Sequence, residues 1–348
     1  MSFGTIFDKF ISIQTNFKMQ YTLPKTISAS LLALSILLIC SCNDNKTSAY
    51  KAESSGNLNQ LSIVITNENW QDSIGEKIRE IFAADVDGLP QQEPKYALRQ
   101  IPPMAFSGFA RKNRTFLKIE KSKKTGHQIL LDSFAKPQFG IVITGSNQQT
   151  IIEELEQNKD SFLKKLHDTE LKEKRRRMSK APKKVDVLKK SIGVSMLFPS
   201  AYRYAKQEDN FFWMRKDIRN GSMELLVYEV PKSTIEKNGN VIANVIKMRD
   251  SVGENIPGPT EDTHMITEEA YAPYLFETEI DGKFAYEIKG TWEVKGFFMA
   301  GPFLTYAIRD DKNDRYVILE GFVFKPSSSK RNQMFEIEAI LRSAKFQD

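Results

Sequence analysis

Few side chains in this sequence could act as a catalytic base. The chain of 348 residues has three His, namely His127, His167 and His264, and of these His264 has acidic neighbours in the sequence. Asp250 and Glu293 are the pair of carboxylates to test for glycoside hydrolysis, which needs only two such groups. The Gly-x-Ser-x-Gly turn that presents a serine nucleophile does not occur. The residues therefore favour a non-enzymatic protein, and a hydrolase that uses Asp250, Glu293 or His264 is the alternative.

A second group of side chains is suited to binding. Trp70 and Trp292 each follow a predicted strand, and tryptophan is favoured at the centre of binding surfaces. Trp213, which stands among apolar residues, is predicted to be core. For Trp70 and Trp292 the alternative to a binding role is core packing. For Arg249 and Asp250 the alternative is an ion pair between them at a helix end. The candidate binding residues are Trp70, Arg79, Arg249, Asp250, Trp292 and Glu293.

Both cysteines, Cys40 and Cys42, lie close together near the start of the sequence. With no cysteine after them, the body of the protein has neither a disulfide scaffold nor a thiolate metal site nor a cysteine nucleophile. Three scattered His leave little room for a multi-histidine metal centre. We therefore expect no metal and no cofactor.

The segment before Cys42 has the plan of a secretory signal. An uncharged apolar run, residues 27–40, follows Lys18 and Lys25 and ends beside a small residue. The run is shorter than the roughly 18 to 20 residues that span a bilayer, so a transmembrane anchor is the less favoured alternative. We predict a signal segment over residues 1–41, in which Met19 is an alternative start.

The end of this segment, Ser41-Cys42, resembles the cleavage site of bacterial lipoproteins, in which a small residue precedes the cysteine that becomes the lipidated first residue. Ile39 stands where that pattern prefers Leu, and an incidental cysteine beside an ordinary cleavage site is the alternative. Several acyl chains on one cysteine hold a protein stably at a membrane. We predict lipidation of Cys42 and a location in the bacterial cell envelope, facing the periplasm or at the outer-membrane surface.

Residues 42–59 are polar and rich in Asn and Ser, which predicts a flexible tether after the lipidated cysteine. Loss of Asp8, Lys9, Lys18 and Lys25 with the signal segment changes the charged side chains from 50 basic and 44 acidic to 47 and 43, a net charge of +4. So small a net positive charge does not indicate that the protein binds nucleic acid. The partners that we expect are the membrane, through the anchor, and an envelope protein; the oligomeric state is left open.

Hydrophobic periodicity predicts that the first half of the body is α+β, with βα units on a mixed sheet. The turn at residues 144–147 resembles a phosphate-binding turn but lacks the motif of one. Its polar residues are explained by Ser146 or Asn147 as the N-cap of the following helix. Pro182 follows the long basic helix, so the domain is predicted to span residues 60–182. Its strands are expected at residues 61–66, 96–101, 115–119 and 139–144, and its helices at 71–84 and from about 147 to Pro182.

The second half, residues 183–348, is predicted to be a mainly antiparallel sheet packed by helices, because its strands are joined by hairpin-like turns. Its strands are expected at residues 192–199, 211–214, 223–228, 275–280, 284–288, 303–308 and 316–324, and its helices at 241–252 and 329–342. The fold class is therefore α+β with two domains, and the second half loosely resembles the PsbP-type sandwich, a likeness of fold that gives no function.

Several motifs of the body are specific when they are taken together. They are Trp70 with Gly75 and Arg79, Leu89-Pro90-Gln91, Glu93-Pro94, Arg249-Asp250-Ser251-Val252, Ile256-Pro257-Gly258-Pro259, Thr291-Trp292-Glu293-Val294, Gly301-Pro302-Phe303 and Lys330-Arg331. With these motifs the chain resembles a lipoprotein family of the Bacteroidota, domain of unknown function 4837, although Ala300 stands where the family pattern has a further Gly. The resemblance extends from about Leu61 to Leu341 and implies a lipid-anchored envelope protein without an established activity.

These observations give one hypothesis and one alternative. We expect a lipid-anchored, non-enzymatic envelope protein of two α+β domains that binds a ligand or serves as an accessory to a protein assembly. An envelope hydrolase that uses carboxylate or His264 chemistry is the alternative.

Overall fold

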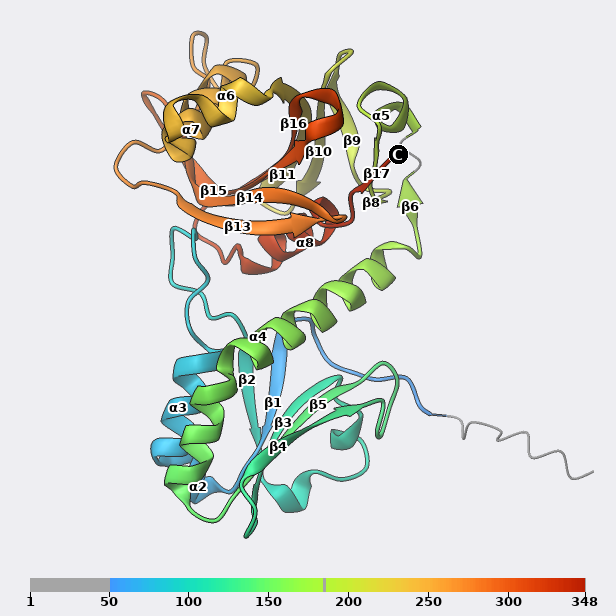
Figure 1. Cartoon of the computed structure of the whole chain (residues 1–348), viewed down its shortest axis with the longest axis vertical. Coiled ribbons are helices and arrows are strands. Elements are labelled where there is room, and N and C mark those ends of the chain that lie inside the picture. Colours follow the sequence, from blue (N-terminus) through green and yellow to red (C-terminus); the bar gives the residue numbers. More distant parts are fainter. Residues whose placement is uncertain (1–50, 184–185, 348) are drawn as a thin grey trace, which may run out of the picture. The chain divides into compact units, whose positions relative to one another are not determined.

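The computed structural model describes residues 51–183 and 186–347, and from Lys51 onward the chain forms one compact unit. The predicted signal segment, Cys42 and the first part of the predicted tether lie outside the described residues. Within the described residues the fold is α+β with two domains, each built around its own sheet (Figure 1). In this part of the chain no helix is both long enough and apolar enough to cross a membrane.

The first domain is a mixed five-stranded sheet in the order β2-β1-β3-β5-β4. The four strands β1, β2, β3 and β5 are parallel, whereas β4 pairs antiparallel with β5. The strand β4 was not expected, because its first three residues are polar or Gly and only one of its edges is paired. The strands are β1 (Gln60–Val64), β2 (Ala97–Ile101), β3 (Thr115–Lys121), β4 (Gly126–Leu131) and β5 (Phe139–Gly145).

Helices cover this sheet and bury its apolar side chains. They are α2 (Asn67–Gln71), α3 (Ser73–Phe82) and the long α4 (Gln148–Met178). The predicted N-cap is confirmed at Asn147, whose side chain accepts a hydrogen bond from Thr150 N, while the Thr150 side chain accepts one from Asn147 N. Residues such as Ile141 on β5 and Phe162 on α4 are fully buried in the same cluster.

Residues 51–59, by which the chain enters this domain, are hydrogen-bonded to it. The prediction of a flexible tether is therefore wrong for these residues. Ser54 N donates to Lys136 O at 3.1 Å, and Arg114 N donates to Ser55 O at 2.8 Å. Polar composition predicted a tether because the segment has little to bury. It could not reveal that backbone groups of the segment form hydrogen bonds with loops far along the sequence, which satisfies them.

The second domain is a larger antiparallel sheet in the order β12-β14-β15-β16-β11-β10-β9, with β13 also paired to β14. Helix α8 (Arg331–Leu341) packs on one face, and α6 (Lys232–Glu236) with α7 (Val241–Gly253) lies on the other (Figure 1). The strands are β9 (Arg203–Gln207), β10 (Phe211–Ile218), β11 (Gly221–Pro231), β12 (Met265–Thr267), β13 (Tyr274–Ile280), β14 (Lys283–Val294), β15 (Phe297–Asp310) and β16 (Arg315–Phe324).

Residues 192–199 do not form the single strand that the sequence predicts. They contain the short strands β7 (Val194–Ser195) and β8 (Phe198–Pro199), after helix α5 (Asp186–Ser191). The strand β7 pairs with β17 (Lys345–Phe346) and β8 pairs with β6 (Pro182–Lys183), both outside the large sheet. The apolar run is still buried, because Val194 and Phe198 belong to the core under α8.

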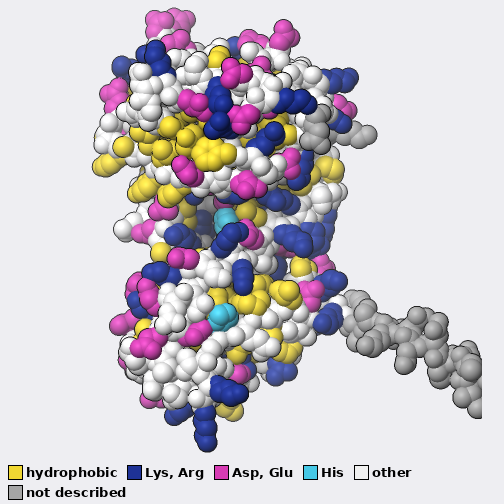
Figure 2. Space-filling view, viewed as in Figure 1, with side chains coloured by type: hydrophobic (Ala, Val, Ile, Leu, Met, Phe, Trp, Pro, Cys, Tyr) yellow, Lys and Arg dark blue, Asp and Glu magenta, His cyan; other side chains and the backbone are white. Residues whose placement is uncertain are grey.

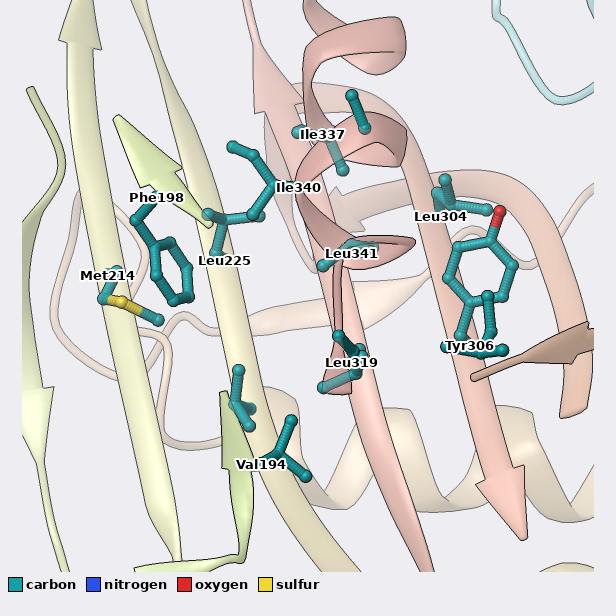
Figure 3. Packing of buried hydrophobic residues seen from close by; sticks show 14 of the residues in the cluster. Val194, Phe198, Met214, Leu225, Leu304, Tyr306, Leu319, Ile337, Ile340 and Leu341 are labelled. Carbon is teal, nitrogen blue, oxygen red and sulfur yellow. The ribbon is translucent and has the colours of Figure 1, made fainter. Parts of the chain in front are cut away.

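The core under α8 is closely packed. Figure 3 shows Ile337, Ile340 and Leu341 of this helix beside Leu225 and Leu319 of the sheet. The helix can come this near because position 321 on β16 is Gly: a Cβ there would lie 2.4 Å from Ile337 Cγ2. Burial of these side chains is the main stabilising contribution of this face.

The opposite face of the sheet contains a buried ion pair between Arg249 of α7 and Glu320 of β16. The distances are 2.9 Å from Arg249 Nε to Glu320 Oε2 and 2.8 Å from Nη2 to Oε1. Thr305 Oγ1 also donates to Glu320 at 2.8 Å, and the guanidinium lies 3.4 Å from the centroid of the Phe303 ring. The suggested ion pair between Arg249 and Asp250 is therefore wrong, and Asp250 accepts a hydrogen bond from Thr267 N at 2.7 Å.

This pair gives a prediction about stability. The substitution Arg249→Met should lower the free energy of unfolding by about 3–5 kcal/mol, because it leaves the Glu320 carboxylate buried without its cation. The double variant Arg249→Met/Glu320→Met should recover most of that loss. Urea unfolding of the whole chain, followed by circular dichroism, measures both.

The matched control is Arg309→Met, which removes the partly exposed ion pair between Arg309 and Asp311. It should change the free energy of unfolding by less than about 1 kcal/mol. Equal losses in the single and double Arg249 variants would contradict the prediction, since the loss would then come from packing alone.

Candidate functional site

The sequence-predicted binding residues fall in two places that do not meet. In the first domain Trp70 and Arg79 lie together: the guanidinium is 4.8 Å from the centroid of the Trp70 ring, and Arg79 Nη1 donates to Trp70 O at 3.1 Å. This contact joins the end of α2 to α3. It stabilises a helix junction, and both side chains are partly buried.

The other four candidates belong to the second domain and are largely internal. Trp292 is 2% exposed and packs edge-on against Phe322, with ring centroids 5.4 Å apart. Arg249 directs its donors to Glu320 and Thr267. Glu293 is half-buried on β14, opposite Ile266 of β12. Core packing, the alternative for Trp292, therefore holds.

The carboxylates and His264 form no compact catalytic group. Asp250 and His264 line one shallow hollow of about 410 Å³ beside α7, and Glu293 is not among the residues that line it. Within the described residues no hydrogen bond joins the side chains of Asp250 and His264, and no cluster of three or more His, Cys, Asp or Glu could hold a metal ion. The hollow could bind a small group, but it lacks a positioned acid–base pair.

An aromatic cavity of about 330 Å³ lies at one end of the large sheet. Trp213, which was predicted to be core, is only partly buried and lines it together with Trp292. Burial raises the pKa of the Glu224 carboxyl in its wall, and hydrogen bonds from Ser222 and from Trp213 Nε1, the latter at 2.8 Å, oppose that rise only in part. The one buried carboxyl is thus already bonded within the protein.

A cleft of about 310 Å³ offers more varied chemistry. It lies within the compact unit where α4 and the loop before β2 meet β14, β15 and α8. Its walls are mainly apolar, and the side chains that form them include Leu89, Leu163, Phe303, Leu304, Met334 and Phe335.

A hydrogen-bonded pair crosses this cleft. His167 Nε2 of α4 lies 2.7 Å from Glu338 Oε1 of α8, and the His167 ring packs edge-on against Phe335. Burial alone would raise the pKa of Glu338, but the hydrogen bond from His167 and the charges of nearby cations outweigh it and hold the pKa below its usual value. The Glu338 carboxylate therefore stays charged at neutral pH.

Cations outnumber carboxylates around the cleft. Four basic side chains line it, Lys95, Lys164, Lys289 and Arg331, against the two carboxylates of Asp87 and Glu338. Figure 2 shows Lys and Arg side chains gathered around the middle of this face. Lys95 forms no side-chain hydrogen bond or ion pair with any residue in the described ranges, whereas Lys164 pairs with Asp168 and Lys289 with Glu287. The excess of cations favours an anionic group in the cleft.

The adjacent residue Tyr96 adds a neutral donor. Burial raises the pKa of its hydroxyl well above the usual value for tyrosine, with the carboxylates nearby as a smaller cause. The group therefore remains protonated at any ordinary pH. Lys95 and Tyr96 together supply a cation and a hydroxyl just before β2.

Glu93 holds the two domains together at the edge of the cleft. Its carboxylate accepts hydrogen bonds from Lys330 N at 2.7 Å and from Arg331 N at 3.0 Å, at the first turn of α8. Arg331 Nη1 in turn donates to Pro94 O at 2.8 Å. A carboxylate at a helix N-terminus satisfies free N–H groups and interacts favourably with the helix dipole. The motifs Glu93-Pro94, Lys330-Arg331 and Gly301-Pro302-Phe303 thus meet around one site.

Sequence reasoning missed this site. His167 lies within the predicted long basic helix, four residues after Leu163 and four before Leu171, a spacing that continues an apolar face. That spacing could have identified it. Lys95, Tyr96 and Glu338 carry no comparable local signal.

Two family models match the chain. Residues 181–343 match the domain of unknown function DUF4837, and residues 54–179 match a different one, DUF8532. The DUF4837 resemblance expected from the sequence is confirmed, but over a narrower range than residues 61–341, because the first half matches its own family. No curated protein matches the chain.

Among solved structures, the chain is similar to cyanobacterial PsbP from Synechocystis sp. PCC 6803, with 10% identity and a TM-score of 0.31 over 44% of this chain and 87% of that one. The Ran-binding protein Mog1p of Saccharomyces cerevisiae is 10% identical, with a TM-score of 0.30 over 45% and 91% of the two chains. LpqN of Mycobacterium tuberculosis, described as involved in cell envelope biogenesis, is 10% identical, with a TM-score of 0.27 over 44% and 83%. The two matched segments follow each other along the chain, residues 54–179 before residues 181–343, and both families are described as domains of unknown function.

Proposed function

We propose that this chain is a lipid-anchored, non-enzymatic binding protein of the bacterial cell envelope, and that its cleft holds a small amphipathic anion. The observation that carries the proposal is the combination of apolar walls with four Lys or Arg side chains in one hollow. The volume of about 310 Å³ is at the lower end of the range for small-molecule sites.

The distribution of polar groups favours one orientation of such a ligand. Lys95 and Tyr96 lie just before β2, while Leu163 of α4 and Phe335 of α8 form part of the apolar wall. A carboxylate or phosphate would accept hydrogen bonds from the first pair, and a short hydrocarbon chain would contact the second. Charge-assisted hydrogen bonds would fix the head group, and apolar burial would supply most of the affinity.

The anchor is supported by the sequence around Cys42. A signal-like apolar run, residues 27–40, precedes a small residue and the cysteine, which is the arrangement in lipoproteins. An anchored binding protein would hold its ligand near the membrane surface or pass it to an envelope protein, which is the partner that we propose.

The alternative, an envelope hydrolase, has weaker support. Asp250 and His264 share a shallow hollow, but no hydrogen bond joins their side chains within residues 51–183 and 186–347. Glu293 lies on β14, outside the residues that line this hollow. A binding role needs no catalytic arrangement of these side chains, and it gives the cleft a use as the site of the ligand.

Ligand binding can be tested with fatty acids and a fluorescent anion. Anilinonaphthalene sulfonate should bind the cleft with saturation, and decanoate should displace it. Decanoate should bind more tightly than the neutral decanol. The substitution Lys95→Gln should weaken decanoate about two- to fivefold, which corresponds to about 0.5–1 kcal/mol for one ion pair, and should leave decanol unchanged.

The matched control is Lys172→Gln, which removes an exposed lysine of α4 that is not part of the cleft. It should leave both affinities unchanged. Equal affinity for decanoate and decanol, or an equal effect of the two lysine substitutions, would overturn the assignment of the cleft to an anion.

The anchor can be tested by metabolic labelling with a clickable fatty acid in a bacterial host. The wild-type chain should be labelled, Cys42→Ala should lose the label, and Cys40→Ala should keep it, because acylation needs the thiol of the first mature residue. A Cys42→Ala chain that is labelled as strongly as the wild type would exclude this anchor.

A further inference from the structure

The first domain exposes apolar side chains on two neighbouring loops. Met104 is 96% exposed and Phe109 72%, both in the loop after β2, while Leu131 is 70% and Phe134 40% exposed at and after the end of β4. Soluble surfaces rarely gather several large apolar side chains, and such patches mark interaction sites. We call these four residues, together with Lys51, Arg111 and Lys136, the entry surface.

The two loops of the entry surface are fixed to each other. The buried Phe106 packs edge-on against Phe134, with ring centroids 6.0 Å apart, and the Arg111 guanidinium lies 5.2 Å from the centroid of Phe134. Gln138 Nε2 donates to Arg111 O at 2.6 Å. The exposed apolar side chains therefore stand on a packed base rather than on isolated loops.

The charge of the entry surface is basic. Lys51, Arg111 and Lys136 are all exposed. The acidic side chains nearby are engaged within the protein: Asp132 Oδ1 accepts a hydrogen bond from Gln138 N at 2.8 Å, and Glu53 pairs with Arg176 at 3.3 Å. Exposed apolar and basic side chains on the same loops match a membrane surface that contains anionic lipids.

The path of the chain identifies which membrane this would be. Lys136 N donates to Ala52 O at 2.9 Å, and Lys51 Nζ donates to Asp132 O, so residue 51 lies against the loop that carries Phe134. Cys42 comes nine residues earlier in the sequence. Nine residues reach at most about 30 Å. An acyl chain on Cys42 would thus keep Lys51, which belongs to the entry surface, within about that distance of the anchored cysteine.

We propose that the entry surface docks onto the bilayer that holds the Cys42 lipid, with Met104 and Phe109 in the headgroup region and the three basic side chains on anionic headgroups. The argument for this occupant rests on the anchor proposed above. A second copy of this chain and a protein partner are the other occupants that the experiment must separate.

The test uses the whole mature chain with Cys42→Ala, so that no acyl chain contributes. It should sediment with vesicles of phosphatidylcholine containing about one-third phosphatidylglycerol, and at least tenfold more weakly with pure phosphatidylcholine. Raising the salt concentration should weaken binding, because headgroup attraction is screened. Met104→Ser/Phe109→Ser in the same background should lose at least tenfold in affinity.

The control is Phe298→Ser, which removes a fully exposed phenylalanine near the start of β15, in the second domain. It should bind vesicles as the parent does. All of these side chains are exposed, so circular dichroism should be unchanged throughout. Absence of vesicle binding, or an equal loss in Phe298→Ser, would overturn the proposal.

Two further outcomes separate this proposal from others. If the parent is a dimer by analytical ultracentrifugation and Met104→Ser/Phe109→Ser is a monomer, the surface is an interface between copies and the proposal is wrong. If Cys42 is labelled by fatty acid but the unlipidated chain does not bind vesicles, the lipid anchor is supported and the docking surface is wrong. Vesicle binding without labelling of Cys42 would support the surface and remove the anchor.

Discussion

The first domain depends on one buried ion pair, between Arg114 and Glu170. Arg114 Nη2 lies 2.9 and 2.8 Å from the two carboxylate oxygens, and both side chains are almost completely buried. Arg114 also donates to Gly56 O and Asn57 O, and Glu170 accepts from Asn59 N at 2.7 Å. Burying two charges is costly unless their remaining hydrogen-bonding groups are satisfied. Here that requirement fixes three parts at once: the residue just before β3, the C-terminal half of α4 and the path by which the chain enters the domain.

The same helix links that core to the cleft. His167 lies three residues before Glu170 on α4, so one turn of the helix carries both the internal ion pair and the hydrogen bond to Glu338. The position of α4 in its own domain therefore determines where His167 meets α8. In the second domain Arg249 and Glu320 repeat the arrangement of a buried Arg–Glu pair between a helix and the sheet. Each domain thus contains one charged contact that tolerates little displacement.

Local periodicity predicted most strands and helices, because burial of one face leaves a regular pattern in the sequence. It failed where burial is irregular: β4 is a partly exposed edge strand, and residues 192–199 are buried without joining the large sheet. The ion-pair and hydrogen-bond partners of charged residues also could not be predicted from the sequence. Arg249 is next to Asp250 in the sequence but forms its ion pair with Glu320. At the edge of the cleft, Glu93 accepts a hydrogen bond from Lys330 N, although the two residues are far apart in the sequence. Such pairings depend on how the domains fold and pack, and one sequence holds no local record of them.

Glu93 also bears on how the two domain families are combined. Residues 54–179 and 181–343 match separate models, yet the N-terminus of α8 in the second is bonded to a carboxylate in the first. Joining residues 181–343 to a different neighbour would leave those N–H groups to water or to a new acceptor. Exchange of either segment would therefore remove this helix cap unless the new neighbour supplied another carboxylate. The contacts that stabilise α8 thus extend beyond the segment that one family model delimits.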